Sequence, residues 1–443
     1  MKKLFGTDGI RGKANCFPMI PELMVSLGKA LAKYFSAGSK PIVVLGKDTR
    51  VSGYMLETAL TSGLVSAGAD VFLVGPLPTP AIAYLIKSFN ADFGIMISAS
   101  HNHYEDNGIK VFDSKGYKLS DSQEEEIEAL LEKNSFSPKD IGKAYRIQDA
   151  KGRYIEYAKS TINNMPLEGF KIVVDCANGA AYDVAPSILK ELGAKVIPIN
   201  CQPNGYNINL NCGALEIDQL SKRVVSEKAD LGIALDGDAD RVVIVDSSGK
   251  KVNGDYLLGL ISLDLKNSKR LNKNKVVATI MSNSSLEVFL KENGISLVRT
   301  KVGDRYVIEA MREQNLSFGG EQSGHIIIGQ HNTTGDGIIA SLELLKVMKS
   351  KNLKSTAFSS IFKLNPQVLV NVKVSEKIDF VQLPNFRKKL EEAEKELQNN
   401  GRVLARYSGT ENVARIMVEA KSEKKAKKIA NDLAKCLESE VSK

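Results

Sequence analysis

A unit repeated three times along the chain constrains its fold more than any other feature. Each copy begins with a short apolar run rich in β-branched residues and continues with a segment of helical periodicity. In the first copy that periodicity places Leu56, Leu60 and Leu64 on one face. A glycine suited to a left-handed helix cap closes the segment, and two further strand-like runs follow. The strand-like runs are 41–45, 71–74 and 91–96, then 171–174, 196–199 and 229–234, then 275–278, 297–298 and 316–319, and the glycines are Gly68, Gly193 and Gly294.

Strand–helix–strand order at this spacing predicts largely parallel or mixed sheets covered by helices, an α/β fold. The C-terminal part lacks the repeat and combines strands with two helices, which is typical of an α+β domain. A chain of 443 residues is also too long for one ordinary core. We therefore expect three similar α/β domains and a C-terminal α+β domain, with limits at 1–148, 149–249, 250–363 and 364–443.

Composition and charge narrow the function classes. No apolar stretch of about 18 residues is present, so no membrane partner is expected. The 5 cysteines are scattered without a CxxC pair, and together with an N-terminus unlike a signal peptide they favour a reduced, cytoplasmic setting. The net charge of +8 is not concentrated in a patch with aromatic residues, so nucleic acid is not expected. The lysines of 421–428 form the solvated face of a predicted helix, whose apolar positions are Ala426, Ile429, Ala430, Leu433 and Leu437.

Polar loops follow the third strand of every copy. They span 98–102, 236–241 and 320–325, and each is rich in glycine, acidic residues or hydroxyl groups. In open α/β sheets, ligands bind beyond the carboxyl ends of the strands. The three loops are therefore expected to form one composite site.

The second of these loops is acidic and predicts a metal site. Asp236, Asp238 and Asp240 alternate directly after an apolar strand, and three close carboxylates suit a hard cation such as magnesium or calcium. A calcium loop of the EF-hand type is excluded, because its sixth and twelfth positions would be Arg241 and Ser247. Two alternatives stay open at this point. The loop could be a solvated acidic turn, or Asp236 could be the nucleophile of an aspartyl-phosphate hydrolase.

The first loop contains a candidate nucleophile, Ser100, followed by His101. A neighbouring Ser–His pair is weak evidence for a hydrolase, because triads are defined by geometry, and the serines could also cap a helix. Ser100 gains weight from the basic Lys110 and from the acidic loop of the next repeat. A phosphoserine adds about two negative charges, which the cation of that loop would compensate.

Two further groups of residues are suited to a phosphosugar. Arginines around a turn of small residues make a dianion site in the C-terminal domain. The third loop offers a carboxylate and a hydroxyl to sugar hydroxyls, beside a histidine that could equally be a core residue. These groups are Arg406, Ser408, Gly409, Thr410 and Arg415 for the dianion, and Glu321, Ser323 and His325 for the sugar.

Taken together, these loops in this order resemble the α-D-phosphohexomutase superfamily over nearly the whole chain. Segments 5–12, 320–325 and 333–337 are similar to its bacterial amino-sugar branch, whereas the mannose and glucose branches usually carry Met in place of Gln322. The resemblance implies four domains around a central cleft and an isomerase that interconverts glucosamine 6-phosphate and glucosamine 1-phosphate. It also implies a bisphosphate intermediate and a role in supplying UDP-N-acetylglucosamine for peptidoglycan. A mutase acting on mannose or glucose phosphates and a non-catalytic sugar-phosphate binder stay open as alternatives.

The resemblance also implies roles for individual residues. One Mg²⁺ per chain would be held by the phosphate of Ser100 and by Asp236, Asp238 and Asp240. Glu321 and Ser323 would recognise the sugar. The distal phosphate would be bound by Arg406, Ser408, Gly409, Thr410 and Arg415. Groups that orient the substrate or move protons would be Arg11, His101, Lys110, Arg241 and His325. Implied partners are the phosphosugar, an activating glucosamine 1,6-bisphosphate or similar bisphosphate, and an activating kinase, with the chain a monomer or homodimer.

Several positions depart from the pattern of the superfamily. His103 and Asn412 stand where proline is usual, which removes a backbone restraint from two of the loops. The segment 212–216 lacks the usual Thr/Ser-His after its glycine, and Ser284 and Ser285 replace Leu-Gly. None of these positions is a proposed ligand, so activity is still expected, with loop rigidity and substrate preference in question.

Overall fold

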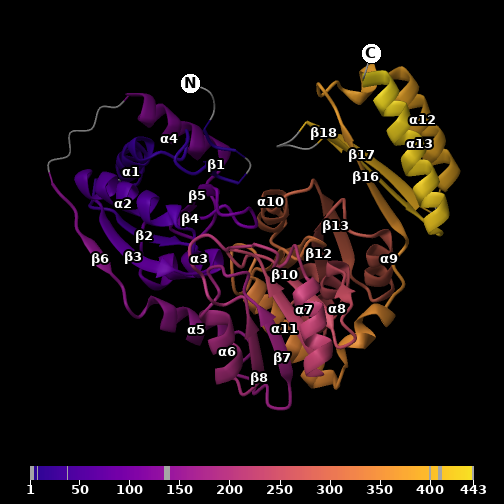
Figure 1. Ribbon diagram of the computed structural model, residues 1–443, viewed down its shortest axis with the longest axis horizontal. Helices are drawn as coiled ribbons and strands as arrows, with labels where there is room; N and C mark the ends of the chain where they lie inside the picture. The colour runs from indigo at the N-terminus through magenta and orange to yellow at the C-terminus, as the bar shows by residue number, and fades with distance from the viewer. Residues whose placement is uncertain are drawn as a thin grey trace. The chain divides into compact units, whose positions relative to one another are not determined.

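The computed structural model describes residues 4–6, 8–36, 38–133, 140–398, 401–407 and 412–441 (Figure 1). By compactness the chain divides into two units. The larger comprises 1–281 and 297–360, and the smaller comprises 282–296 and 361–443. In the described part of the chain, no helix is both long and apolar enough to cross a membrane.

The larger unit contains three sheets. The first has the strand order β1-β5-β4-β2-β3-β6. Its strands are β1 (Ile10–Lys13), β2 (Ile42–Lys47), β3 (Asp70–Pro76), β4 (Phe93–Ile97), β5 (Asp106–Asp113) and β6 (Ala144–Arg146). The helices of this region are α1 (Pro21–Phe35), α2 (Ser52–Ser66), α3 (Thr79–Ser88) and α4 (Asp121–Lys133).

The second and third sheets follow in chain order. The second, β11-β10-β9-β7-β8, contains β7 (Lys171–Asp175), β8 (Lys195–Ile199), β9 (Leu231–Leu235), β10 (Val242–Asp246) and β11 (Lys251–Val252). The third, β13-β12-β14-β15, contains β12 (Lys275–Thr279), β13 (Ser296–Thr300), β14 (Phe318–Gly320) and β15 (Ile326–Ile328). The accompanying helices are α5 (Ala150–Ser160), α6 (Val184–Glu191), α7 (Asp218–Glu227), α8 (Gly254–Asn267), η1 (Asn272–Asn274), α10 (Asp304–Gln314), α11 (Gly337–Lys351) and η2 (Ser355–Ser360).

One strand pattern occurs in all three sheets and confirms the predicted repeat. The first strand of each copy lies between the second and the third, in the orders β3-β2-β4, β8-β7-β9 and β13-β12-β14. The first and third strands are parallel, and the strand that follows the third returns antiparallel to it. Gly68, Gly193 and Gly294 have φ of +93°, +90° and +64°, as their predicted role in ending helices requires.

Burial explains why these strands read as continuous apolar runs. Every residue of β4 and of β9 is buried, because helices cover both faces of a parallel sheet. The antiparallel return strand makes the connection after the third strand short. These connections lie between β4 and β5, between β9 and β10, and between β14 and β15. They hold the three polar loops that the sequence singles out.

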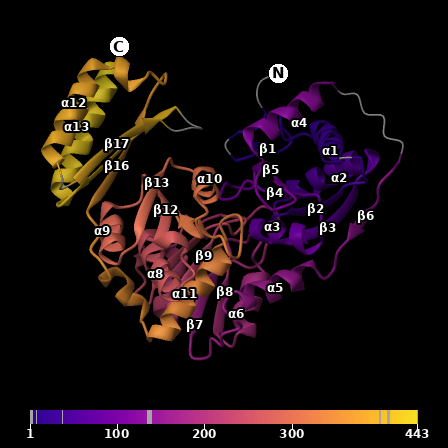
Figure 2. The same cartoon turned by 180° about the vertical axis from the view of Figure 1, so that it is seen from behind.

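The smaller unit contains the antiparallel sheet β16-β18-β17 and confirms the α+β prediction. Its elements are α9 (Ser284–Glu292), β16 (Gln367–Lys373), η3 (Phe380–Gln382), α12 (Pro384–Leu397), β17 (Gly401–Tyr407), β18 (Val413–Ala420) and α13 (Glu423–Val441). Helices α12 and α13 lie side by side on one face of the sheet (Figures 1 and 2). The apolar positions predicted for α13, among them Ile429 and Leu433, are buried against that face.

The residues Ser284 and Ser285 begin α9 and contact neighbours within the smaller unit. The Ser284 N–H donates to Glu419 Oε1 at 3.0 Å, and Ser284 Oγ accepts from Asn365 Nδ2 at 2.9 Å. The Asn365 N–H donates to Ser285 Oγ at 3.2 Å. The two serines that replace Leu-Gly thus hold the helix start to β18 and to the segment before β16.

The predicted domain limits stay predictions. The limit between 249 and 250 falls inside the hairpin formed by β10 and β11, whose register pairs Ile244 with Val252.

Candidate active site

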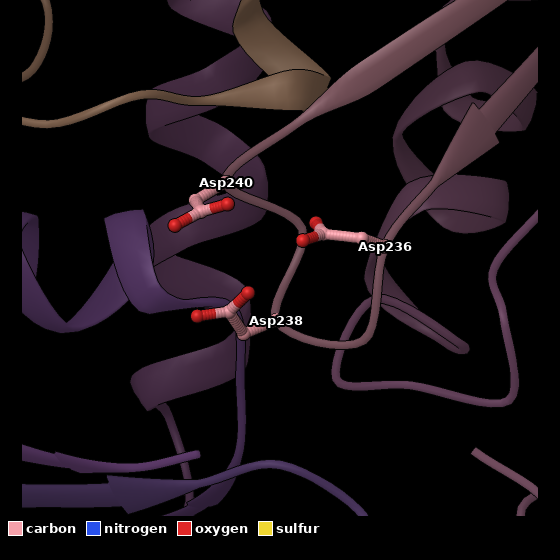
Figure 3. Close-up of side chains that lie close together, drawn as sticks. All are labelled: Asp236, Asp238 and Asp240. Carbon is pink, nitrogen blue, oxygen red and sulfur yellow. The ribbon is translucent and has the colours of Figure 1, made fainter. Parts of the chain in front are cut away.

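The acidic loop brings three carboxylates together directly after β9. Asp236, Asp238 and Asp240 are all buried, and one oxygen of each lies within 4.8 Å of the others (Figure 3). Among the described residues, Asp238 Oδ1 and Asp240 Oδ1 are buried without a hydrogen-bond donor. Buried carboxylate oxygens without donors fit a hard divalent cation, because such a cation is bound by several oxygen ligands. The solvated-turn alternative is wrong, since these side chains are not solvated.

Lysine 110 supplies the nearest positive charge. Its Nζ lies 2.8 Å from Asp238 Oδ2, 3.4 Å from Asp240 Oδ2 and 3.5 Å from Asp8 Oδ2, and its side chain is buried. Burial alone would lower the pKa of Lys110, but Asp238 and Asp8 outweigh it and raise the pKa well above its usual value. Lys110 is therefore a cation in this arrangement.

The carboxylates differ in their pKa. Burial, with the nearby charges of Asp240 and Asp238, raises the pKa of Asp236 well above its usual value. Burial acts in the same direction on Asp240, but Lys110 and His325 outweigh it and lower the pKa of Asp240. Lys110 and Arg241 do not fully offset the three carboxylates, since Asp240 and Asp238 still raise the pKa of Asp236, and a bound cation would relieve this repulsion.

The backbone of the acidic loop is held from three sides. The carbonyl oxygens of Gly237, Asp238 and Ala239 accept, in that order, from the N–H groups of Ala180 (2.8 Å), Thr79 (3.0 Å) and Gly337 (3.0 Å). Ala239 adopts a left-handed conformation with φ of +57°, which costs free energy for any residue but glycine. Each of these N–H groups comes from the region of a different sheet, so the packing of the three regions preorganises the loop.

Thr79 was not singled out from the sequence. Its hydroxyl donates to Asp238 Oδ2 at 2.6 Å, and the residue is fully buried at the first position of α3. The only local signal is its place between two prolines at a helix start, Pro78 and Pro80. That pattern indicates a helix N-terminus and says nothing of a carboxylate beside it.

The candidate nucleophile of the serine loop, Ser100, contacts the acidic loop. Ser100 Oγ donates to Asp236 Oδ2 at 2.8 Å, and the residue is 1% exposed. Its backbone has φ of +51°, a left-handed conformation that is uncommon for serine and that is held here by the surrounding contacts. Any side chain at Gly237 would lie 2.5 Å from the carbonyl oxygen of Ser100, so glycine is required where the two loops meet.

A buried arginine holds the serine loop in this conformation. Arg50 Nη2 donates to the carbonyl oxygens of Ser100 at 3.0 Å and Asn102 at 2.8 Å, and Nη1 donates to that of His103. Asn209 Nδ2 donates to the first two of the same oxygens, at 2.9 Å each. These contacts restrain the loop although His103 lacks the ring of the usual proline.

Asp48 completes this support. Its Oδ2 accepts from Arg50 Nε at 2.9 Å and from Ser98 Oγ at 2.6 Å, and Ser98 Oγ in turn accepts from the Ser100 N–H at 2.9 Å. Asp48 and Arg50 follow β2 and were not singled out from the sequence. Their contacts join positions about 50 residues apart, and no local pattern indicates them.

His101 and Arg241 lie beside the nucleophile. His101 Nδ1 is 3.5 Å from Ser100 Oγ and 3.1 Å from Arg241 Nη1. Burial first, and then the charges of Arg241 and Arg11, lower the pKa of His101 to about 4. The imidazole is therefore neutral at neutral pH. Arg11 pairs with Asp8, and Asp8 also pairs with Lys110 and Lys118.

The third loop places a histidine against the acidic loop. His325 Nδ1 lies 3.7 Å from Asp240 Oδ1, and His325 Nε2 accepts from the Gly335 N–H at 3.1 Å. In the neutral ring the proton is therefore on Nδ1. Burial would lower the pKa of His325, but Asp240 outweighs it and raises the pKa.

The proposed sugar ligands lie on the same loop. Glu321 is buried, and its Oε1 accepts from the Gly303 N–H at 3.1 Å, whereas Ser323 is exposed. A cavity of about 510 Å³ is lined by residues of all three polar loops, namely His101, Asp236, Arg241, Gln322 and Ser323. Ala214 and Leu215, which replace the usual Thr/Ser-His pair, line the same cavity. The composite arrangement of the three loops is thus present in the larger unit.

The proposed dianion site belongs to the smaller unit. Arg406 on β17 is directly opposite Arg415 on β18, so two positive side chains share one face of the sheet. Like charges in such a pair repel one another, and a bound dianion would relieve this repulsion. Ser408, Gly409 and Thr410 lie outside the described residues, and their role stays a prediction.

Comparison with known proteins identifies the family. Four models of phosphoglucomutase/phosphomannomutase match the chain in order: alpha/beta/alpha domain I at 2–138, domain II at 152–249, domain III at 253–364 and the C-terminal domain at 369–436. The chain belongs to the phosphoglucomutase/phosphomannomutase family. The predicted resemblance and the predicted fold class are thereby confirmed.

Curated relatives are similar over their full length. A phosphoglucosamine mutase of Lawsonia intracellularis is 48% identical over 440 residues, which cover 98% of this chain and 98% of the relative. One of Rhizobium johnstonii is 50% identical and covers 98% of this chain and 97% of its own. A crystal structure of a phosphoglucomutase/phosphomannomutase family protein from Burkholderia thailandensis has a TM-score of 0.82 at 21% identity, covering 99% of this chain and 98% of that one. That last likeness concerns the fold.

Membership of the phosphoglucomutase/phosphomannomutase family settles the class of chemistry. The chain is an isomerase of the phosphohexomutase type. A solved N-acetylphosphoglucosamine mutase of Aspergillus fumigatus, which has the same fold, is described in complex with magnesium. Asp236, Asp238 and Asp240 fit such an ion by their donor type, their spacing and their unbonded oxygens. The roles of the other predicted site residues stay predictions.

Proposed function

We propose that this chain is a phosphoglucosamine mutase, which interconverts glucosamine 6-phosphate and glucosamine 1-phosphate. The proposal includes a phosphoserine at Ser100 and a sugar bisphosphate as intermediate. Curated relatives of that name, 48–50% identical over nearly the whole chain, support the substrate. One observation carries the mechanism. Ser100 Oγ lies 2.8 Å from Asp236 Oδ2, and the backbone of Ser100 is in a left-handed conformation.

The reaction is a transfer and a return. A free hydroxyl oxygen of the sugar monophosphate forms a bond to the phosphorus on Ser100 while the bond from Ser100 Oγ to phosphorus breaks. The proton of that hydroxyl passes to an acceptor in the cavity. Ser100 Oγ takes up a proton as it leaves phosphorus. The bisphosphate then turns, Ser100 Oγ loses its proton and bonds the other phosphorus, and the sugar oxygen that leaves this phosphorus takes up a proton. Catalysis of this kind consists of positioning and neutralisation of charge.

The side chains of the three loops divide these tasks. Asp236, Asp238, Asp240 and the phosphate of Ser100 would hold Mg²⁺, which would supply positive charge to the phosphoryl group. Arg241 and Lys110 add further positive charge, and Arg241 orients His101 beside the nucleophile. Glu321 and Ser323 recognise the sugar hydroxyls, and His325 lies 3.7 Å from Asp240 of the acidic loop. Arg406, Ser408, Gly409, Thr410 and Arg415 bind the phosphate that does not react, and Arg11 orients the substrate.

Activation and cellular role complete the proposal. Glucosamine 1,6-bisphosphate or a similar bisphosphate would phosphorylate Ser100 and so start the cycle, and a protein kinase would be an alternative source of the first phosphate. The product would supply UDP-N-acetylglucosamine synthesis in the cytoplasm.

A coupled assay tests the substrate. With Mg²⁺ and a bisphosphate primer present, we expect glucosamine 1-phosphate to form from glucosamine 6-phosphate faster than the glucose or mannose phosphates are interconverted. Faster turnover of glucose or mannose phosphates would assign the chain to another branch of the family. Tight binding of the sugar phosphate without turnover would favour a non-catalytic binder.

Arg406→Ala tests the dianion site. A hydrogen bond to a charged group contributes about 1.5–3 kcal/mol, so substrate affinity should fall by roughly 10- to 150-fold. Because binding of the distal phosphate also orients the reacting oxygen, turnover should fall with it. Mg²⁺ binding should be unchanged, and binding and kinetics are measured on the same preparations.

Arg387→Ala is the matched control for this change. Arg387 is an exposed arginine of α12 in the same unit, where it pairs with Glu391 four residues on. It should behave as wild type. Unchanged substrate affinity in Arg406→Ala, together with lost Mg²⁺ binding, would show that the two loops were assigned wrongly.

A further inference from the structure

Tyr154 and Asp336 form a buried hydrogen-bonded pair that takes no part in the proposed reaction. Tyr154 lies on α5, which connects the regions of the first and second sheets, and it is fully buried. Its hydroxyl donates to Asp336 at 3.0 Å from Oδ1 and 2.9 Å from Oδ2. Asp336 Oδ1 also accepts from the N–H groups of Ile338 (3.1 Å) and Ile339 (2.9 Å) and so caps α11.

The carboxylate of Asp336 has an unusual environment. Within the described parts of the chain, no lysine or arginine forms an ion pair with it, and burial raises its pKa to about 6. Its negative charge is therefore carried by hydrogen bonds alone, from Tyr154, Asn332 and the start of α11. Such a network is costly to leave partly unsatisfied, because an unpaired buried polar group loses its hydration without compensation.

The backbone on both sides of Asp336 contacts the proposed catalytic groups. The Gly335 N–H donates to His325 Nε2 at 3.1 Å, and the Gly337 N–H donates to the carbonyl oxygen of Ala239 at 3.0 Å. The approach is close, since a side chain at Gly335 would lie 2.5 Å from His325 Cε1 and 2.6 Å from the carbonyl oxygen of Asp240. A shift of this segment would move the acidic loop and the histidine together.

Asn332 links the same pair to the other side of the acidic loop. Its Nδ2 donates to Asp336 Oδ2 at 3.2 Å and to the carbonyl oxygen of Pro80 at 3.1 Å. Pro80 follows Thr79, whose N–H and hydroxyl both hold Asp238. Two of the three N–H groups that hold the acidic loop are therefore connected to Asp336. Gly337 is its neighbour in the chain, and Thr79 precedes Pro80, which is bonded to Asn332.

We propose that Tyr154 is a positioning residue for the metal site. Its hydroxyl holds Asp336, Asp336 holds the segment 335–337, and this segment holds the left-handed Ala239 between two metal ligands and the ring of His325. Loss of the hydroxyl should leave all three aspartates in the chain but restrain their positions less well, so a cation should bind more weakly. The consequence for turnover rests on the proposed function, whereas the consequence for metal binding does not.

Tyr157 provides the matched control. It lies on the same helix, its ring stacks on Tyr84 at 4.0 Å between centroids, and its hydroxyl donates to the carbonyl oxygen of His331. Among the described residues, its hydroxyl makes no hydrogen bond to Asp336 or to the acidic loop. Tyr157→Phe therefore removes a tyrosine hydroxyl from the same helix while every hydrogen bond to Asp336 stays in place.

The experiment compares Tyr154→Phe, Tyr157→Phe and wild type as full-length proteins. Binding of Mn²⁺, as a paramagnetic substitute for Mg²⁺, is titrated by electron paramagnetic resonance, and thermal unfolding and mutase kinetics are measured alongside. We expect Tyr154→Phe to bind Mn²⁺ about tenfold more weakly, as for the loss of one hydrogen bond to a charged group. At saturating sugar phosphate and a Mg²⁺ concentration below the wild-type dissociation constant, its kcat should fall by a similar factor, with KM for the sugar phosphate nearly unchanged. Tyr157→Phe should keep wild-type Mn²⁺ affinity even where its melting temperature falls.

A merely structural role predicts a different result. In that case Tyr154→Phe would lower the melting temperature while its Mn²⁺ affinity, like that of Tyr157→Phe, stays that of wild type, and the proposal would be overturned. If Tyr154→Phe fails to fold, Asp336→Asn serves instead, because its Oδ1 still caps α11 while an NH2 group at the Oδ2 position no longer accepts from Tyr154 or Asn332. Wild-type Mn²⁺ affinity in that variant would likewise overturn the proposal. A wild-type chain without mutase activity would refute the proposed function, while the difference in Mn²⁺ affinity would still test the inference.

Discussion

Ser100→Ala is expected to lower mutase turnover by on the order of 10⁴-fold or more, the scale seen when a covalent nucleophile is removed. Alanine lacks the oxygen that bonds phosphorus, and no other hydroxyl is bonded to Asp236 in the described residues. The fold should survive, because Arg50 and Asn209 hold the loop through backbone carbonyl oxygens that the substitution keeps. Turnover is measured in the coupled assay, and thermal unfolding checks the fold.

Mapping of the phosphate separates this mechanism from that of a hydrolase. In wild type the protein-bound phosphate label should be stable to hydroxylamine and lie on Ser100. In Ser100→Ala this label should be absent. Ser122→Ala, at an exposed position of α4, should retain both the label and the activity. A hydroxylamine-labile label on Asp236 would overturn the phosphoserine mechanism, since an acyl phosphate has that lability.

Asp236→Asn is expected to change activity and stability in opposite directions. Removal of one of three carboxylates should weaken Mg²⁺ binding by roughly 100-fold, about the effect of losing a charged interaction of 2.7 kcal/mol. Turnover at fixed Mg²⁺ should fall accordingly. Without Mg²⁺, however, the variant should unfold at a higher temperature than wild type, because burial and the charges of Asp240 and Asp238 disfavour the ionised carboxylate of Asp236.

The sign of the stability change follows from the pKa. The folded-state pKa of Asp236 is raised, so the folded protein loses stability relative to the unfolded chain as pH rises above the ordinary pKa of aspartate. An amide has no such charge, and the advantage of Asp236→Asn in metal-free buffer should therefore grow from acid to neutral pH. Asp246→Asn, at the β10 end and outside the acidic loop, should leave Mg²⁺ affinity unchanged. Equal Mg²⁺ affinity in Asp236→Asn and wild type would exclude Asp236 as a ligand.

Much of the fold could be predicted because its signals are local. Strands such as β2 and β7 are short, apolar and β-branched, and the left-handed glycines at 68, 193 and 294 directly follow periodic segments. The repeat then placed three polar loops at equivalent positions. That the loops would meet followed from the rule for carboxyl ends of strands, and the cavity they share agrees with it.

The supports of the site could not be predicted in the same way. Arg50, Asn209 and Thr79 bond to loops that are 50 to 159 residues away in the chain. Their residue types are common, and their partners are mostly backbone oxygens, which have no sequence signature. The left-handed conformation of Ser100 is likewise set by those partners rather than by its own sequence. The pair of Tyr154 and Asp336, 182 residues apart, belongs to the same class.

The three anchors of the acidic loop also bear on how the molecule assembles. Because Thr79, Ala180 and Gly337 belong to the regions of three different sheets, the carboxylates reach their arrangement only when all three regions have docked. Metal binding and docking are then thermodynamically linked, and each must strengthen the other by the same factor. The second region alone would carry all three aspartates and yet bind the ion weakly. Tight binding of the cation would therefore indicate that the three regions are docked correctly.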